Sequence, residues 1–269
     1  MLMRDVELNN PELMELLNDL AADIGDMITN HEELLIKDLQ EKVYKNSPEC
    51  RAAEGKSQIW KSTPHMDILP ELCTEVGNLY DPVGREYLDL MIDIAEKQKP
   101  LHDVSEYCGW PNKEIFLSLI DLRANQILRD KYSIDKKADS ITYGWLNGNS
   151  RALFGLYPPG GYIPWHNNGN APGYNILMHY NWGGDGSFYS LHDNEIVEYA
   201  DPDKKWVARA GQFLSTGAGM VGDEVKQVPQ RDASWHAAST RTWRLTVSTI
   251  INNFDVWEDV IDEMETAEL

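Results

Sequence analysis

Cysteine is scarce in this chain of 269 residues, which holds only three. Cys50, Cys73 and Cys108 are widely spaced, odd in number and form no CxxC pair, so we expect reduced thiols rather than a disulfide framework. Long apolar runs are absent too, and no stretch approaches the roughly 20 residues that a membrane span needs. The first residues are acidic where a signal peptide would be basic and then apolar. These features predict a cytoplasmic protein.

Basic residues are also few, with 24 Lys and Arg against 44 Asp and Glu and a formal charge of −20. Such a body repels phosphate backbones and anionic lipid, so binding to nucleic acid or to a membrane surface would need a local basic patch. The densest basic stretch, Lys131–Lys137, is short and contains Asp135. We therefore expect neither partner. A protein or small-molecule substrate is expected instead, and the negative charge favours a cationic one.

The first 137 residues have the apolar spacing of helices. Asn10 followed by Pro11 marks a helix start, with Asn as N-cap and Pro at the first helical position. Leu and Ile then recur every three or four residues from Leu13 to Ile28. Glu32–Val43 is expected to continue this helix or to form a second one, and further helices are expected after Pro82 and after Pro111.

From residue 138 to 253 the chain has short β-branched and aromatic runs separated by turns. Asn147-Gly148, between Ile141–Leu146 and Arg151–Tyr157, predicts a hairpin, because this dipeptide favours the positive φ angles of a type I′ turn. The other predicted strands are Gly161–His166, Tyr174–Tyr180, Gly186–Leu191, Glu195–Tyr199, Trp206–Ala208, Gln212–Ser215 and Thr242–Ile251.

Many short strands with regular turns predict a closed or sandwiched antiparallel β domain. The predicted fold class is therefore α+β, with a helical region at residues 1–137 packed on a β domain at residues 138–253. The acidic tail, residues 254–269, is expected to form a helix on the body.

Two of the seven histidines lie in the β-rich part in a pattern that suits a metal site. His166 ends the predicted strand that contains Tyr162, and Asn168 follows two residues later. Alternation places Tyr162, His166 and Asn168 on one face if the strand continues. His236 lies in a separate segment near the end of the β-rich part. Two imidazoles suit a divalent transition metal such as iron, with an open side for substrate.

An arginine that follows the second histidine adds a carboxylate-binding group. Arg244 begins a strand and shares a face with Thr246 by alternation. A guanidinium backed by a hydroxyl can bind a small carboxylate in a bidentate manner. Arg241 is the rival for this role, although alternation turns it to the opposite face.

Three segments, YPPGGYIPWHNN, NILMHYNWGGDGSFYSL and WHAASTRTWRLTVSTI, together resemble the iron(II)/2-oxoglutarate-dependent oxygenase superfamily. That family uses a double-stranded β-helix (a jelly roll) with a His-x-Asp/Glu motif, a distal His, and a later Arg or Lys that binds the 2-oxoglutarate carboxylate. The resemblance implies His166 and His236 as ligands of Fe(II), and Arg244, Thr246 and Tyr162 around the cosubstrate. The implied activity is hydroxylation of a protein side chain or small molecule by O₂, coupled to 2-oxoglutarate decarboxylation.

The sequence departs from the family pattern at Asn168, where a carboxylate ligand is expected. The spacing is also similar to the aspartyl/asparaginyl β-hydroxylase branch, which has Gly there and a second His that helps hold the cosubstrate; His179 matches that His. The Arg that this branch has two residues earlier is Leu177 here. Asn168 ligates the metal through its amide oxygen, leaves the place to water, or marks a loss of turnover. Asp185 is a substitute carboxylate, although its Gly-Gly-Asp-Gly context favours a loop role.

Two other functions stay open. A catalytically inactive β-helix that serves as a binding protein is favoured by Asn168. A cupin-type metalloenzyme with another divalent metal would not need the pair of Arg244 and Thr246. We also expect His192 to lie in a hairpin turn and Pro158–Gly161 to be a candidate lid before the strand that ends at His166.

Overall fold

The computed structural model describes residues 3–45, 81, 83–97, 120–121, 130–168, 173–214 and 228–267. The three cysteines lie outside these residues. So does the predicted helix after Pro111, except for Ile120–Asp121, which is strand β2 rather than helix.

The first helix, α1 (Pro11–Lys45), begins where the sequence predicts. The side-chain oxygen of Asn10 accepts hydrogen bonds from two backbone N–H groups of the first turn, at 3.0 and 3.1 Å. The backbone leaves helical geometry at His31, and of the two alternatives for Glu32–Val43 the structure shows the continuation of α1, beyond this kink. Helix α5 (Arg85–Lys97) follows the predicted start at Pro82, and α8 (Phe254–Glu265) forms in the acidic tail.

The first predicted hairpin is wrong. Where a strand was expected at Ile141–Leu146, the chain forms α7 (Ile134–Asp139) and continues into the π-helical turn η2 (Ser140–Trp145). Three apolar residues of this segment have helical spacing and are fully buried against α1 and the larger sheet: Ile134, Ala138 and Ile141. This packing outweighs the local β-branched and aromatic content.

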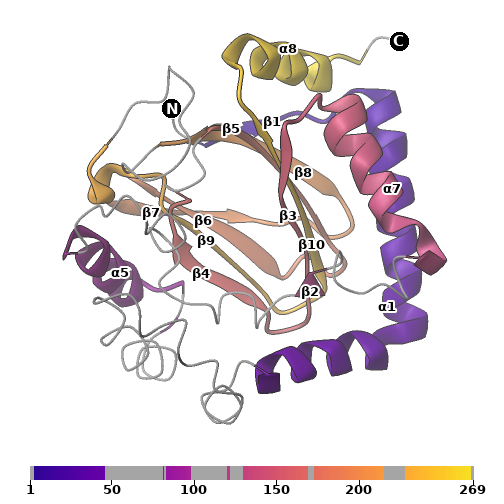
Figure 1. Cartoon of the computed structure of the whole chain (residues 1–269), viewed down its shortest axis with the longest axis horizontal. Helices are drawn as coiled ribbons and strands as arrows, with labels where there is room; N and C mark the ends of the chain where they lie inside the picture. Colours follow the sequence, from indigo (N-terminus) through magenta and orange to yellow (C-terminus); the bar gives the residue numbers. More distant parts are fainter. Residues whose placement is uncertain are drawn as a thin grey trace.

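Among the described residues, the strands form two antiparallel sheets (Figure 1). The larger sheet has the order β1 (Arg4–Val6), β8 (Trp206–Phe213), β5 (Gly173–Asn181), β10 (Arg244–Ile251), β3 (Ser150–Tyr157), β2 (Ile120–Asp121). The smaller sheet has the order β4 (Tyr162–His166), β9 (His236–Thr240), β6 (Gly186–His192), β7 (Glu195–Ala200).

These antiparallel sheets confirm the prediction of a β-rich second half, with two differences. The predicted strands Trp206–Ala208 and Gln212–Ser215 are one strand, β8, which pairs with β5 along its whole length. Strand β9 was not predicted, because its sequence, His-Ala-Ala-Ser-Thr, has little β-branched or aromatic character.

The two sheets face each other, and helices pack on the outer side of each. Tyr157 of the larger sheet packs on Ile163 and Ala238 of the smaller sheet, so these side chains lie in the interior between the sheets. On the outer side of the larger sheet, α1 and α7 contribute to one hydrophobic core with its strands, and Figure 1 shows both helices along that side. Helix α5 packs on the outer side of the smaller sheet. The structure is an antiparallel β-sandwich with flanking helices; the double-stranded β-helix stays a prediction.

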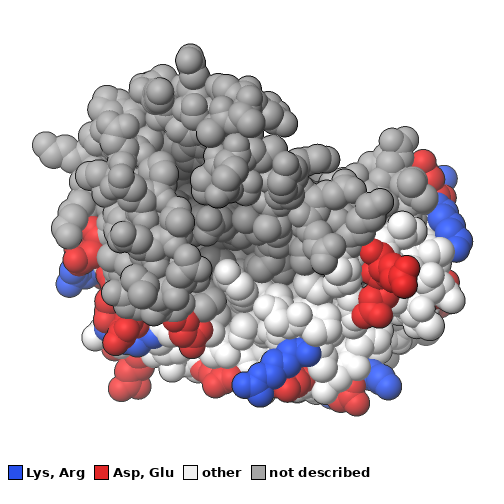
Figure 2. Space-filling model, turned by 90° about the horizontal axis from the view of Figure 1, so that it is seen from below, with Lys and Arg blue, Asp and Glu red and all other residues white. Residues whose placement is uncertain are grey.

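None of the described helices combines the length and the apolar character that crossing a bilayer demands. On the described part of the face in Figure 2, acidic side chains lie beside the basic ones. Charges of the two signs are therefore interspersed on that part of the surface.

Candidate metal and anion site

The two histidines that the sequence singles out lie side by side in the smaller sheet. His166, the last residue of β4, pairs in register with His236, the first residue of β9. Their ring centroids are 4.1 Å apart, and both side chains are buried. The structure therefore brings together the two imidazoles that are distant in the sequence.

The imidazole of His236 is held in one orientation. Its Nδ1 lies 2.7 Å from the carbonyl oxygen of Ser234, and since a carbonyl only accepts, Nδ1 donates the proton. Phe213 stacks on the ring at 4.9 Å with an interplanar angle of 7°. Burial lowers the pKa of His236 to about 4, so the ring is neutral at pH 7. Its Nε2 then keeps the lone pair that a metal ion needs.

Asn168 reaches the histidine pair through a turn rather than through strand alternation. Strand β4 ends at His166, and Asn168 has a φ of 50°, in the left-handed region that Asn tolerates well. Its Nδ2 lies 3.4 Å from Nε2 of His236, an arrangement in which the amide donates to the imidazole lone pair. Exchange of the two amide positions by rotation would present Oδ1 there instead. Asn168 can therefore supply an oxygen ligand at this point.

Tyr162 lies on the other face of β4. A register shift between Ile163 and His166 breaks the alternation on which the shared face depended. Tyr162 pairs with Ser239, whose hydroxyl lies 3.4 Å from that of Tyr189, and Tyr189 packs in the cluster under α5. The expectation that Tyr162 shares a face with His166 is therefore wrong, and its role in cofactor binding loses that support.

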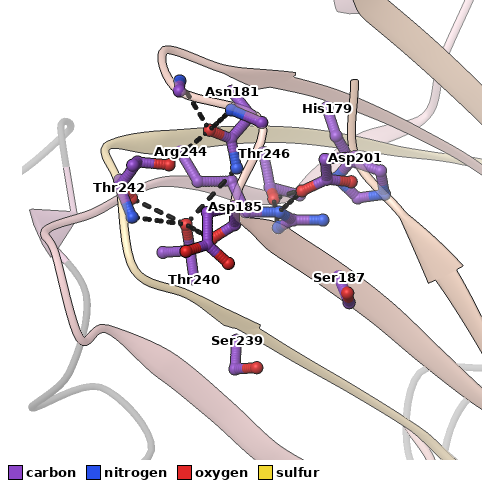
Figure 3. A network of polar contacts seen from close by, with 12 residues as sticks. His179, Asn181, Asp185, Ser187, Asp201, Ser239, Thr240, Thr242, Arg244 and Thr246 are labelled. Atoms are coloured by element: carbon purple, nitrogen blue, oxygen red, sulfur yellow. Dashed lines mark hydrogen bonds and ion pairs between the residues drawn. The ribbon is translucent and has the colours of Figure 1, made fainter. Parts of the chain in front are cut away.

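Arg244 lies in the interior on the facing sheet and is fully buried. Its Nη1 donates to Oγ1 of Thr246 at 2.7 Å, as expected for two residues on one face (Figure 3). Its Nε donates to the carboxylate of Asp201 at 2.5 Å, and its guanidinium lies over the ring of Tyr157 at 5.2 Å. Within the part of the chain that is described, Nη2 has no hydrogen-bond partner. Sequence reasoning did not foresee that a carboxylate of the protein itself contacts this arginine.

His179 of β5 joins the same polar group. Its Nδ1 lies 3.0 Å from Oγ1 of Thr246, and its Nε2 finds no hydrogen-bond partner among the described residues. Burial, followed by the positive charges of Arg244 and Arg209, lowers the pKa of His179 well below its ordinary value. The imidazole is therefore neutral, with one nitrogen directed at Thr246 and the other unpaired.

Arg209 of β8 is an interior residue that the sequence analysis missed. It pairs in register with Leu177 and is buried. Its guanidinium lies over the rings of Phe188 at 5.6 Å and Tyr199 at 4.8 Å, both from the smaller sheet. The available signal was an arginine between two alanines within a strand. It was missed because the two predicted strands, Trp206–Ala208 and Gln212–Ser215, left Arg209 in the gap between them, whereas the structure has one strand.

Phe188 of β6 contacts one histidine of the pair and one of the polar group. Its ring stacks on His236 at 5.8 Å and on His179 at 5.7 Å. Since His236 is in the smaller sheet and His179 in the larger one, both halves of the candidate site face the same interior.

The sequence offered Arg241 as an alternative to Arg244 and Asp185 as an alternative to Asn168, and both lie at turns outside the interior. Arg241 and Asp185 form an ion pair at 3.9 Å with side chains 85% and 60% exposed, which leaves Arg244 as the candidate in the interior. His192 ends β6 in a hairpin whose turn consists of Asp193 and Asn194, with φ of 47° and 67°. His192 therefore lies in the expected hairpin, but as the last strand residue before the turn rather than in the turn itself.

A cavity of about 770 Å³ adjoins the second histidine from the side of α5. Its lining includes Ser190, which pairs in register with His236, and Ser234, whose carbonyl accepts from His236. Its charged lining residues are Arg85, Asp89, Asp93, Asp193, Arg231 and Asp232. The cavity can admit a small molecule or a side chain to the neighbourhood of the histidine pair.

Within the described ranges, no group of three or more His, Cys, Asp or Glu side chains is placed to hold a metal ion. The available donors are two buried imidazoles and the amide of Asn168. Neutral nitrogen donors suit borderline divalent ions such as Fe(II) or Zn(II). The residues therefore fit a metal that keeps several positions for water or an anionic ligand, although they would bind it less firmly than a set with a carboxylate.

Comparison with known proteins gives little further guidance. No protein-family model and no curated protein matches the chain. The chain is similar to the crystal structure of a predicted oxalate decarboxylase from Thermotoga maritima, with 15% identity, 38% of this chain and 70% of that chain covered, and a TM-score of 0.21. It is also similar to the capsular polysaccharide assembling protein CapF from Staphylococcus aureus, with 15% identity, coverage of 53% and 39%, and a TM-score of 0.18. Such low scores carry no argument about function.

Proposed function

We propose that this chain is a metal-dependent enzyme that binds one divalent transition metal, Fe(II), at His166 and His236. The single observation that carries the proposal is the fixed geometry of this pair. The two rings lie 4.1 Å apart on paired strands, tilted by 57°, and the Ser234 carbonyl holds Nδ1 of His236 so that Nε2 is directed at the Asn168 amide and is the atom that would bind a metal. Two buried imidazoles beside a cavity, with that of His236 neutral at pH 7, suit an open metal site.

The proposed reaction is hydroxylation coupled to decarboxylation of 2-oxoglutarate. One oxygen atom of O₂ would enter the new hydroxyl group and the other would enter succinate, with release of CO₂. The metal, when bound, supplies the activation of O₂. The protein would hold the cosubstrate carboxylate with the unpaired Nη2 of Arg244, while Thr246, itself paired with His179, accepts a hydrogen bond from that guanidinium and orients it.

The proposed substrate is a cationic or polar group of a protein or of a small molecule. In the cavity beside the histidines, Arg85 is paired with Asp89 at 2.8 Å. Arg231 is paired with Glu96 at 2.7 Å, while Asp193 and Asp232 add negative charge to the lining. The lining thus carries more acidic than basic residues, which favours a cationic group.

A cupin-type metalloenzyme with another divalent metal is the second candidate. The observation that favours it is the ion pair between Arg244 and Asp201, because an arginine that neutralises a carboxylate of the protein need not bind one from a cosubstrate. An inactive binding protein is the third, and Asn168 is the residue that favours it.

Anaerobic titration with Fe(II) and then with 2-oxoglutarate tests these candidates. For the oxygenase we expect a weak visible charge-transfer band that needs both additions and is lost in His166→Ala. Metal binding with no band and no 2-oxoglutarate consumption would favour the cupin-type enzyme. If no divalent metal binds, the metal proposal fails and the binding protein replaces it. His192→Ala, a change in the hairpin, is the matched control.

A further inference from the structure

We infer that the interior of the sandwich holds a binding site for one carboxylate group of a small organic acid, formed by Arg209 together with His179 and Arg244. The inference deepens the proposed function, since it adds a second guanidinium to the anion-binding half of the site. The inference depends on three buried nitrogen atoms: Nη1 of Arg209, Nε2 of His179 and Nη2 of Arg244.

These residues come from three adjacent strands in the order β8, β5 and β10. Arg209 pairs with Leu177, two residues before His179, and Arg244 pairs with Asn181, two residues after it. The three positions therefore run diagonally across the inner face of the larger sheet. Two residues along a strand span about 7 Å. The long side chains of the two arginines can cover that distance toward the imidazole of His179 between them.

All three side chains are buried and incompletely satisfied. Their exposed fractions are 3% for Arg209, 1% for His179 and 0% for Arg244. Within the described residues, none of the three named nitrogen atoms has a hydrogen-bond partner. Buried donors without partners are rare because each costs about 1–3 kcal/mol, and more for charged groups. Three together on one face point to a ligand that accepts their hydrogen bonds.

The charges of the described groups favour a single anionic group. The buried carboxylate of Asp201 neutralises Arg244. The acid beside Arg209 is Asp5, with 3.1 Å between Nε and Oδ1, but its side chain is 70% exposed and the contact lacks hydrogen-bond geometry, since Nε has no bond partner. Solvent screens such an exposed partner. Burial lowers the pKa of Arg209, although the negative charges of Asp5 and Asp201 act in the opposite direction.

The rival explanation is purely structural, because β1 pairs with β8 and Arg209 would then only hold Asp5 of β1. The two explanations differ for Asp5→Asn. If Arg209 binds an anion, removal of the Asp5 charge leaves the site intact. If Arg209 only holds β1, Asp5→Asn and Arg209→Gln should change the affinity for the organic acid to the same extent.

The test is calorimetric titration of chelator-treated, metal-free protein with succinate and with 2-oxoglutarate. We expect Arg209→Gln to weaken binding by about tenfold or more, as for the loss of a charge-assisted hydrogen bond. Asp5→Asn and the surface control Arg241→Gln should stay within about twofold of the wild type. Arg209→Lys keeps the positive charge but not the planar guanidinium with its paired N–H donors, so we expect an affinity between those of the wild type and Arg209→Gln. Circular dichroism shows whether each variant is folded.

Unchanged affinity in Arg209→Gln, equal losses in Asp5→Asn and Arg209→Gln, or no binding of either acid by the wild type would each overturn the inference. If Arg209→Gln does not fold, unchanged affinity in Arg209→Lys overturns it. His166→Ala separates the two proposals, because it should lose Fe(II) and keep metal-free anion binding. A wild type that binds the acids but takes up no Fe(II) would contradict the metal proposal alone.

Discussion

Asp201 and Arg244 form an ion pair in the interior of the sandwich, with 2.5 Å between Oδ2 and Nε and side chains 1% and 0% exposed. The other carboxylate oxygen, Oδ1, and Nη2 of the arginine have no hydrogen-bond partners among the residues described. Removal of one partner from a buried pair leaves an uncompensated charge, which costs more than the pair itself contributes. The pair therefore affects both the stability of the fold and the binding capacity of the arginine.

Arg244→Gln should lower the free energy of unfolding by about 3–5 kcal/mol, because Asp201 then stays buried and charged without a partner. The double variant Arg244→Gln/Asp201→Asn should regain a large part of that loss. Urea unfolding of both singles and the double gives the coupling. Arg241→Gln, at an exposed ion pair, is the control and should stay within about 0.5 kcal/mol of the wild type. Additive single and double values would contradict the coupling.

Arg244→Ala should raise the apparent KM for 2-oxoglutarate by about one to two decades if Arg244 binds the cosubstrate carboxylate. The reason is the loss of a charge-assisted contact of about 1.5–3 kcal/mol. Steady-state decarboxylation assays at varied 2-oxoglutarate concentration measure it. Arg241→Ala should change KM much less, and the reverse order would identify Arg241 as the binding residue.

His166→Ala and His236→Ala should each abolish tight Fe(II) binding, because each removes one of two imidazole ligands. Far-UV circular dichroism should show the β-sandwich unchanged. Metal content after dialysis, compared with His192→Ala, gives the readout. Wild-type affinity in both variants would exclude the site.

The metal-free protein should lose stability as the pH falls from 6.5 toward 4. In the unfolded chain His236 takes up a proton near its ordinary pKa of 6.5, while burial keeps its pKa at about 4 in the folded protein. The unfolded state therefore binds more protons in this window, and the loss from His236 is about 2 kcal/mol at pH 5. His179, whose pKa is also lowered, contributes in the same direction. Urea unfolding at pH 7 and pH 5 measures the loss, which His236→Gln should reduce; an equal loss in that variant would show that other groups cause it.

Asn168→Asp should strengthen Fe(II) binding, since it places a negative charge beside the histidine pair. The left-handed backbone at this position suits Asp and Gly as well as Asn, so neither substitution should strain the turn. Metal titrations and 2-oxoglutarate consumption are the measurements. Activity retained in Asn168→Gly would mean that water fills this ligand position. If none of the three forms consumes 2-oxoglutarate, the oxygenase proposal fails.

The sequence predicted the parts of this fold that local rules determine. Asn10 and Pro11 mark the start of α1, and alternation places Arg244 and Thr246 on one face. The failures are tertiary in origin. The segment Ile141–Leu146 has strand-like composition but is helical because its apolar side packs against α1. A bulge reverses the face of Tyr162, and a single-residue shift in register cannot be read from composition.

For the candidate site too, the residues with a local signal were predicted from the sequence and those that depend on tertiary packing were missed. His166 and His236 were found because two histidines near strands are a local signal. Asp201 and Arg209 were missed because their significance depends on which strands become neighbours. Asp201 follows β7 and meets Arg244 only through the packing of the two sheets. Arg209 faces the interior because β8 pairs with β5 throughout, whereas the sequence predicted a break.

The ring of Phe188 stacks on both His179 and His236, so it would act as a spacer between a metal ion at the histidine pair and an anion bound to the opposite sheet. A ligand that bridged the two would have to match this thickness and pass beside the aromatic ring. The choice among organic acids of different length would then depend on an apolar side chain that contacts neither end of the ligand. Phe188→Leu should accordingly alter the chain-length preference among dicarboxylates while both binding halves are kept.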